Sequence, residues 1–338
     1  MRVKDGIILI ALAGVCIITG CKQNLTGEQI KAYEQGQVSP EAESAEIKEL
    51  KTRIGIPENA RILNVSRYGS EIPRVVEYGE MKEWRNYKGE TGAQIGDKKI
   101  KLLNESGEVI GEDKLSIIAK DSGGNVSAYI ASSPTNNEQN KIVTINEKGD
   151  VENDIKLIQR EEKKEEKSIL KEHQVGYLSG DGNYIGAFYV KYWTEDKDVG
   201  KLGADLPNAL YRFQYMDKKG HLLWEVTGDR NNPISDNTIK ISRDGGRIIL
   251  TGNDYEKEKE DKDSNYLALY DRNGQLVVKY YYFAVTEIQL TKDGRSAIFT
   301  IDARNNGEIV TKYMILSLND GSLNQTNAQN WNEFNDRL

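Results

Sequence analysis

Side chains that commonly carry out catalysis are scarce in this sequence. The 338 residues include two histidines, His173 and His221, and two cysteines, Cys16 and Cys21, both close to the N-terminus. Two isolated histidines, with both cysteines confined to the N-terminal segment, exclude thiolate and multi-histidine zinc sites. Neither a G-x-S-x-G nucleophile elbow nor a glycine-rich phosphate loop is present. The sequence therefore predicts no catalytic, cofactor-binding or metal-binding residue.

Carboxylates are harder to dismiss, because the chain has 53 aspartates and glutamates. Glycoside hydrolysis needs only two of them at a set separation, which sequence spacing does not test. The segment Asp261-Lys-Asp263-Ser-Asn265 has the alternate oxygen spacing of a calcium loop, but Tyr266 and Arg272 replace its turn glycine and bidentate glutamate. We expect a solvated charged loop there. A hydrolase with paired carboxylates and a calcium- or ligand-responsive sensor remain alternatives.

Aromatic residues gather at two places. Tyr189, Tyr192 and Trp193 precede a polar insert, and Tyr280 to Phe283 are four consecutive aromatic residues. Because neighbouring side chains of a strand point to opposite faces, two of these four should face a different surface from the other two. We expect packing between sheets, with an aromatic face that binds carbohydrate or protein as the alternative.

The N-terminal residues predict export and lipid attachment. Arg2 and Lys4 precede the apolar run Gly6 to Ile18, which is shorter than the roughly 20 residues of a spanning helix. The run ends in Ile18-Thr19-Gly20-Cys21, which resembles the bacterial lipobox. That resemblance implies removal of residues 1–20 and a diacylglyceryl group with palmitate-type acyl chains on Cys21. An uncleaved anchor is the alternative; both place the chain in the cell envelope, bound to membrane lipid and facing out of the cytoplasm.

A tether and a helix separate this segment from the main domain. Residues 21–38 are polar without sustained periodicity, which is typical of a flexible tether. We expect a short amphipathic helix over 39–55, with Ser39 as N-cap and Gly55 near its end.

The rest of the chain alternates two kinds of β-hairpin. Each has a glycine-containing polar turn between apolar, β-branched or aromatic runs, which is the signature of a hairpin. The turn glycines are Gly124, Gly182, Gly245 and Gly294 in one set, and Gly149, Gly220, Gly274 and Gly321 in the other. Two alternating hairpins make a four-stranded meander, and tandem meanders predict a β-propeller.

The sequence thus predicts an all-β, propeller-like domain over 60–327 with about five blades. The expected units span 60–112, 114–158, 173–227, 237–283 and 284–325. A β-sandwich is the structural alternative, although sandwiches usually contain Greek-key crossovers. Polar inserts should form loops between hairpins, and the charged segment 160–173, which begins with the charge run 160–167, has the Glu–Lys spacing of a short helix.

Two turn motifs resemble known propeller families. Ser/Thr-x-Asp-Gly, as in SRDGG and TKDG, resembles the repeats of WD40-like and TolB-type bacterial propellers, although WD40 Gly-His and Trp-Asp pairs are absent. MDKKGHLLW is similar to the core of quinoprotein-type blades, and this similarity implies that Trp224 docks one blade on the next. Val278 holds the equivalent place in the following unit.

The net charge of the chain indicates which classes of partner it can bind. The chain has 46 basic and 53 acidic residues, a net charge of −7, which disfavours nucleic acid because phosphate backbones bind basic surfaces. We expect a lipid-anchored, non-enzymatic binding or scaffold module whose partner is an envelope protein or glycan. The hydrolytic propeller is the alternative.

Overall fold

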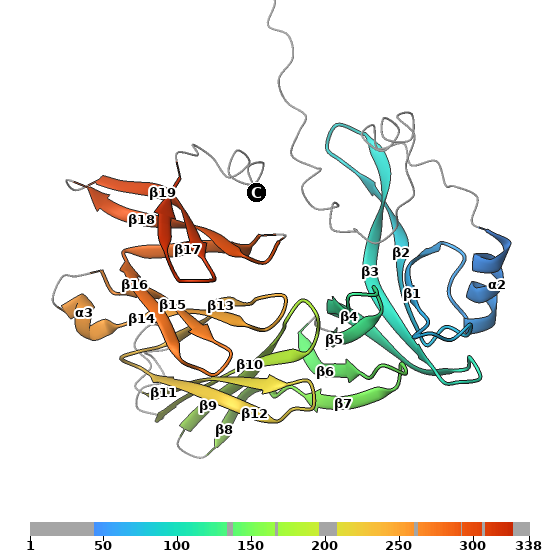
Figure 1. Ribbon diagram of the computed structural model, residues 1–338, viewed down its shortest axis with the longest axis horizontal. Helices are drawn as coiled ribbons and strands as arrows, with labels where there is room; N and C mark the ends of the chain where they lie inside the picture. Colours follow the sequence, from blue (N-terminus) through green and yellow to red (C-terminus); the bar gives the residue numbers. More distant parts are fainter. Residues whose placement is uncertain are drawn as a thin grey trace, which may run out of the picture. The chain divides into compact units, whose positions relative to one another are not determined.

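The computed structural model describes residues 44–133, 138–165, 168–195, 208–259, 263–291, 293–305 and 308–326 (Figure 1). The expected signal segment, Cys21, the tether and Ser39 lie outside these ranges. Within them, no helix has both the length and the apolar character needed to cross a bilayer.

The described residues form two compact units, the first comprising 44–61 and 80–96 and the second comprising 62–79 and 97–326. The first unit contains helix α2 (Ala45–Ile54). This helix begins later than expected, because Ser44 rather than Ser39 is the N-cap. The Ser44 hydroxyl accepts a hydrogen bond from the Ile47 backbone N–H, one of the amide groups that a helix start leaves unpaired. Gly55, in the left-handed conformation, closes the helix as predicted.

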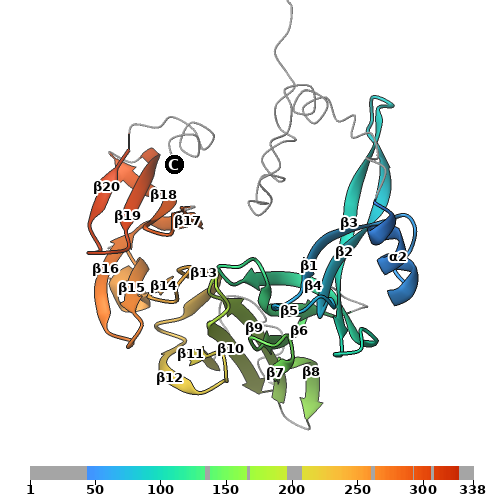
Figure 2. The same cartoon turned by 45° about the vertical axis from the view of Figure 1, so that its right-hand side comes forward.

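Strands make up most of the remainder, in four antiparallel sheets that we call A to D (Figures 1 and 2). Sheet A runs in the order β1 (Ala60–Ser66), β2 (Val75–Arg85), β3 (Thr91–Leu103), β4 (Val109–Lys120), β5 (Val126–Ser132), β6 (Gln139–Ile145) and β7 (Val151–Lys156). Sheet B consists of β8 (Gln159–Glu165), β9 (Ser168–Leu178), β10 (Tyr184–Glu195), β11 (Asn208–Asp217) and β12 (Leu222–Asp229).

The last two sheets have four strands each. Sheet C consists of β13 (Ile234–Ile241), β14 (Arg247–Asn253), β15 (Asn265–Asp271) and β16 (Leu276–Tyr282). Sheet D consists of β17 (Ala284–Leu290), β18 (Ser296–Asn305), β19 (Glu308–Ser317) and β20 (Leu323–Gln325). Neighbouring strands within every sheet are consecutive in the chain. The predicted all-β architecture of tandem antiparallel meanders with a short N-terminal helix is confirmed, and no Greek-key crossover occurs in these sheets.

The first of the five expected repeat units, 60–112, differs from the prediction. Strands β1 to β3 do not form a separate four-stranded sheet but continue sheet A. The cause is the tight turn from Asn104 to Glu108, which returns the chain so that β4 pairs with β3 on one side and with β5 on the other.

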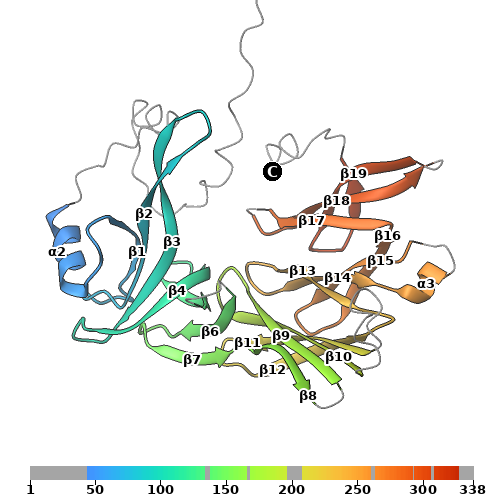
Figure 3. The same ribbon diagram turned by 180° about the vertical axis from the view of Figure 1, so that it is seen from behind.

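Two polar inserts also contain regular structure. The charge run over 160–167 is not helical where it is described: residues 159–165 form β8, which pairs with β9 from Gln159↔His173 to Glu165↔Ser168. An edge strand has unpaired backbone groups, and β8 satisfies those of β9, so backbone pairing prevails over helix propensity there. The insert after β14 begins with the short helix α3 (Tyr255–Lys259), at the end of sheet C (Figure 3).

Each hairpin set has its own turn chemistry. In the Ser/Thr-x-Asp-Gly turns, the hydroxyl of Ser179, Ser242 or Thr291 donates to the aspartate two residues later. The same hydroxyl accepts the backbone N–H of the first residue of the returning strand: Tyr184, Arg247 or Ser296. Glycine follows the aspartate because the turn requires a positive φ, 71° at Gly182.

In the second set, the turns at Gly149, Gly220 and Gly274 share an Asn/Asp-x-x-Gly pattern. The side-chain oxygen of the first residue accepts the backbone N–H groups two and four positions later, as Asp217 does from Lys219 and His221. Asn86, Asn104, Asn146 and Asp271 repeat this arrangement. Such a turn followed by a glycine bulge matches the twist of the strands that it joins.

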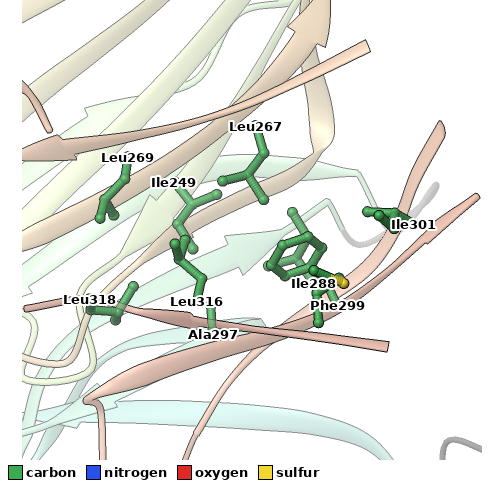
Figure 4. Packing of buried hydrophobic residues seen from close by; sticks show 10 residues of the cluster. Ile249, Leu267, Leu269, Ile288, Ala297, Phe299, Ile301, Leu316 and Leu318 are labelled. Carbon is green, nitrogen blue, oxygen red and sulfur yellow. The ribbon is translucent and has the colours of Figure 1, made fainter. Parts of the chain in front are cut away.

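Apolar side chains fill the spaces between successive sheets of the second unit. Between sheets C and D, Ile249, Leu267 and Leu269 pack against Phe299 and Leu316 (Figure 4). One cluster joins sheets B and C, and another joins sheets A and B. Sheets B and C pack against a neighbouring sheet on each of their two faces, so their central strands are apolar on both faces.

Candidate binding site at the inner turns

A cavity lies where one strand from each sheet reaches its C-terminal end. These strands are β4 of sheet A, β9 of sheet B, β13 of sheet C and β17 of sheet D. Its volume is about 400 Å³. We call it the inner-turn cavity. Its lining residues come from all four sheets: Ile117 and Ile118, Leu178 to Gly180, Ile241 and Arg243, and Leu290, Thr291 and Gly294. Repeat turns far apart in the chain therefore converge on one site.

Backbone hydrogen bonds fix the turns to one another. The N–H of Lys120 donates to the carbonyl of Gly180 at 3.3 Å, and the N–H of Asp181 donates to the carbonyl of Arg243 at 2.9 Å. The hydroxyl of Ser127 also donates to the Asp181 carbonyl, at 2.6 Å. These bonds link sheets A, B and C directly beside the cavity, so the wall has little freedom to rearrange.

Arg243 is the one ionisable residue among the described residues that line the cavity. Its side chain is exposed, and its guanidinium makes no hydrogen bond or ion pair within the described part of the chain. The stem lies between two glycines. A methyl group on Gly180 would lie 3.0 Å from its Cγ, and one on Gly294 would lie 3.7 Å from its Cβ. The two glycines thus provide the space in which this arginine stands.

Other arginines of the second unit have structural roles. Arg247 donates to the carbonyls of Leu318 and Asn319 on the neighbouring sheet. Arg272 donates to the carbonyl of Asp244 and lies over the Tyr184 ring. Arg74, which is buried, donates to the Leu103 carbonyl and pairs with Asp150. Compared with these, Arg243 has donors available for a ligand.

The carboxylates of the inner turns are occupied within their own turns. The backbone N–H of Gly246, with the Ser242 hydroxyl and Arg272, lowers the pKa of Asp244 although partial burial opposes the shift. The Thr291 hydroxyl and the backbone N–H of Arg295 lower the pKa of Asp293. Carboxylates with lowered pKa values are poor proton donors near neutral pH, so these aspartates stabilise turns rather than serve as general acids.

A second cavity, of about 310 Å³, lies in sheet A beside the β1–β2 loop. Its lining includes Tyr68, Arg74, Glu105 and Lys148. Tyr68 has a positive φ of 51°, and its hydroxyl donates to the Val126 carbonyl. Burial raises the pKa of this hydroxyl, so it remains protonated and acts as a donor. The polar groups here hold the loop against the sheet.

The remaining chemistry-capable residues have structural surroundings. His221 is exposed and lies 2.9 Å from Asp217 in its own turn, whereas His173 is part of β9 and lies 3.6 Å from Asp236. No cluster of three His, Cys, Asp or Glu side chains suited to a metal ion occurs in the described ranges. In the calcium-like segment, Asp261 lies outside them and the Asn265 amide donates to the Phe283 carbonyl.

The consecutive aromatic residues divide between two faces, as predicted. Tyr280 and Tyr282 pack against the cluster between sheets C and D. Tyr281 is on the other face, where the Lys257 ammonium lies 4.0 Å from its ring centroid and its hydroxyl contacts Asp254. Most of this run therefore serves packing.

Sequence reasoning missed Arg243, although a signal was present. It is the middle residue of Ser242-Arg243-Asp244, and Gly180 is the middle residue of Ser179-Gly180-Asp181. The middle position of both turns lines the same cavity. Comparing the middle positions of the repeat turns would have singled out Arg243 as a candidate residue, but not the convergence of the turns on one cavity. The corresponding Lys292 lies outside the described residues.

Comparison with known proteins assigns no family. No family model and no curated protein matches the chain. Among solved structures, a eukaryotic initiation factor is similar with a TM-score of 0.31 and 11% identity, over 80% of this chain and 78% of that one. Puromycin hydrolase is similar with a TM-score of 0.32 and 10% identity, over 78% of this chain and 39% of that one.

Prolyl oligopeptidase B from Galerina marginata has a TM-score of 0.28 and 10% identity, over 82% of this chain and 44% of that one. The chain thus spans less than half the length of the latter two proteins. Since none of the three TM-scores reaches 0.5, these similarities assign no activity to it.

Proposed function

We propose that this chain is a lipid-anchored protein of the bacterial cell envelope that binds a partner through the inner-turn cavity. Cys21 carries the lipid, the tether separates the folded part from the bilayer, and the tandem sheets act as a rigid, non-enzymatic binding platform. The partner is an envelope protein or a glycan.

The lining of the inner-turn cavity is the observation that carries the proposal. The described lining residues are aliphatic side chains, two hydroxyl residues, two glycines and one arginine. Recognition uses such a mixture of apolar walls and few polar groups. The hydroxyls of Ser179 and Thr291 are engaged with Asp181 and Asp293. Acid–base hydrolysis would instead call for a pair of carboxylates at the cavity.

Site-specific photocrosslinking in native membranes tests the proposal. Benzoylphenylalanine replaces Ile117, which lines the cavity and is 38% exposed, so that β4 tolerates a large side chain there. The matched control places it at Ile110 of the same strand, which is 63% exposed and does not line the cavity. We expect one reproducible crosslinked envelope partner from position 117 and none from position 110.

A competing variant completes this test. Leu290→Trp places a bulky ring on another wall of the cavity, so it should abolish crosslinking from position 117, whereas Gln289→Trp, at an exposed neighbour outside the lining, should not. Equal crosslinking from both positions, or recovery of the protein alone from position 117, would contradict the proposal. In the second case, the soluble fragment 22–338 should be assayed for hydrolysis of glycans.

A further inference from the structure

Beyond the proposed function, on which this inference rests for the location of the site, we infer that the inner-turn cavity binds a carboxylate carried on an aliphatic group, with Arg243 as its anion-binding residue.

Arg243 determines the sign of the ligand's charge. A planar guanidinium presents paired donors that match the two oxygens of a carboxylate, and such bidentate pairs are among the stronger hydrogen-bonded contacts. Within the described residues, this guanidinium has no partner of its own. The main-chain carbonyl of Arg243 accepts the Asp181 N–H at 2.9 Å, which fixes the backbone from which the side chain extends.

The apolar walls of the inner-turn cavity indicate the chemistry of the rest of the ligand. Ile117, Ile118, Leu178, Ile241 and Leu290 surround the cavity, and Ile241 is only 6% exposed. Apolar walls favour an apolar body beside the anionic group. The cavity volume of about 400 Å³ suits a group the size of one amino-acid residue with its flanking peptide bond.

Acidic residues near the cavity oppose the binding of an anion, so a carboxylate ligand needs a basic residue such as Arg243. Asp181, Asp244 and Asp293 are in the turns whose residues line the cavity, and the lowered pKa values of Asp244 and Asp293 keep those two ionised. Their hydrogen bonds are directed into their own turns. Their charges oppose the binding of an anion, and Arg243 is the basic side chain among the described lining residues that offsets this repulsion.

Binding of N-acetyl-leucine and N-acetyl-leucinamide to the detergent-solubilised full chain tests the inference, because the two probes differ only in the carboxylate. We expect ligand-observed NMR to give a dissociation constant of about 1 mM for the acid, and binding of the amide at least about tenfold weaker. Arg243→Gln should remove this preference. Arg295→Gln, which removes an equal charge from a turn residue outside the lining, should leave it unchanged.

Two longer probes distinguish the source of the carboxylate. If acetyl-Gly-Gly-Leu binds at least about tenfold more tightly than acetyl-leucine and its C-terminal amide does not, the natural ligand is a peptide C-terminus. Similar affinities for the two acids indicate a small free acid. Equal binding of acid and amide, absence of binding, or a preference that survives Arg243→Gln would each overturn the inference.

Failure of this inference is separable from failure of the proposed function. If Leu290→Trp abolishes the crosslinked complex while Arg243→Gln leaves it intact, the cavity binds its partner without a carboxylate. In that case the proposed function remains and the inference is rejected.

Discussion

Single polar side chains fix the conformations of the hairpin turns in this protein. Several of these turns line its candidate site. Ser179 and Thr291 each use one hydroxyl to donate to an aspartate and to accept a strand N–H. In the Ser179 turn these bonds hold the middle residue, Gly180, at the cavity wall. The same residues thus explain both the hairpins that the sequence predicted and the site that it did not.

The turn aspartates also predict how stability changes with pH. Hydrogen bonds from the Ser322 backbone N–H and from the hydroxyls of Ser317 and Ser322 lower the pKa of the exposed Asp320 to about 2. In the unfolded chain, an aspartate titrates at about 3.9. Between about pH 4 and about pH 2 the unfolded chain therefore binds more protons, so this contribution to stability is complete above that range and is lost as the pH falls.

Urea unfolding of the wild-type chain and Asp320→Asn at pH 5, 4, 3 and 2 measures this effect. Asparagine keeps an oxygen acceptor for the Ser322 N–H but does not titrate. The unfolding midpoint of the variant should therefore fall less steeply below pH 4 than that of the wild type. Parallel curves for the two proteins would show that the folded and unfolded pKa values of Asp320 are the same.

At the scale of elements, the sequence predicted strands and hairpins well because these depend on neighbouring residues. Asp271-Arg-Asn-Gly274 carries its own hydrogen-bond acceptor and its own left-handed position, at φ 78°. Pairing between distant segments was harder to predict. The charge run of β8 has strong helix formers, and only the unpaired edge of β9 makes it a strand. Similarly, the start of α2 depends on which serine hydroxyl accepts a hydrogen bond from a backbone N–H of the first turn. It is Ser44, which accepts from Ile47, and not the predicted Ser39.

From the sequence, contacts between sheets could be predicted only where a bulky side chain, such as that of Trp224, indicated them. Trp224 of β12 does lie against the next sheet: its indole N–H donates to the Arg272 carbonyl at 2.9 Å. A methyl group on Gly274 would lie 2.6 Å from its Cγ. Val278 lies against the turn at Gly321 in the same way, with a corresponding distance of 2.8 Å. Convergence of the inner turns had no such marker, since it rests on backbone bonds.

The docking of Trp224 on the Gly274 turn predicts a specific energetic coupling. Trp224→Ala should lower the free energy of unfolding by about 3 kcal/mol, since the ring is partly buried. Gly274→Ala should be destabilising because of its positive φ and its clash with the indole. In the double variant the clash is absent, so the combined loss should be smaller than the sum by about 1–2 kcal/mol.

Chemical denaturation of the four proteins completes this double-mutant cycle. Asn273→Ala, a substitution in the same turn without the glycine conformation, provides a control that should combine additively with Trp224→Ala. Additivity of the Trp224 and Gly274 substitutions within about 0.5 kcal/mol would mean that the two residues are not in contact in solution.

At the scale of the whole molecule, the order of segments suggests how the site reaches its partner. The described residues begin at 44, and the sequence from Cys21 to Val38 is polar. If these residues form the proposed flexible tether, its root-mean-square span is about 25 Å, which would let the folded part move over the membrane surface without leaving it. Confinement of this kind raises the effective concentration of partners in the same membrane.

In the proposed function, confinement at the membrane depends on the lipid that we propose for Cys21. Cys21→Ala should abolish incorporation of labelled palmitate and, if residues 1–20 remain uncleaved, leave a precursor of higher mass. Cys16→Ala, which changes a cysteine of the same apolar segment, should retain both labelling and cleavage. Because two or more acyl chains anchor a protein where one binds only weakly, the wild-type chain should resist extraction by alkaline carbonate. Labelling that survives Cys21→Ala would place the lipid elsewhere, and the tethered arrangement proposed for the inner-turn cavity would then be wrong.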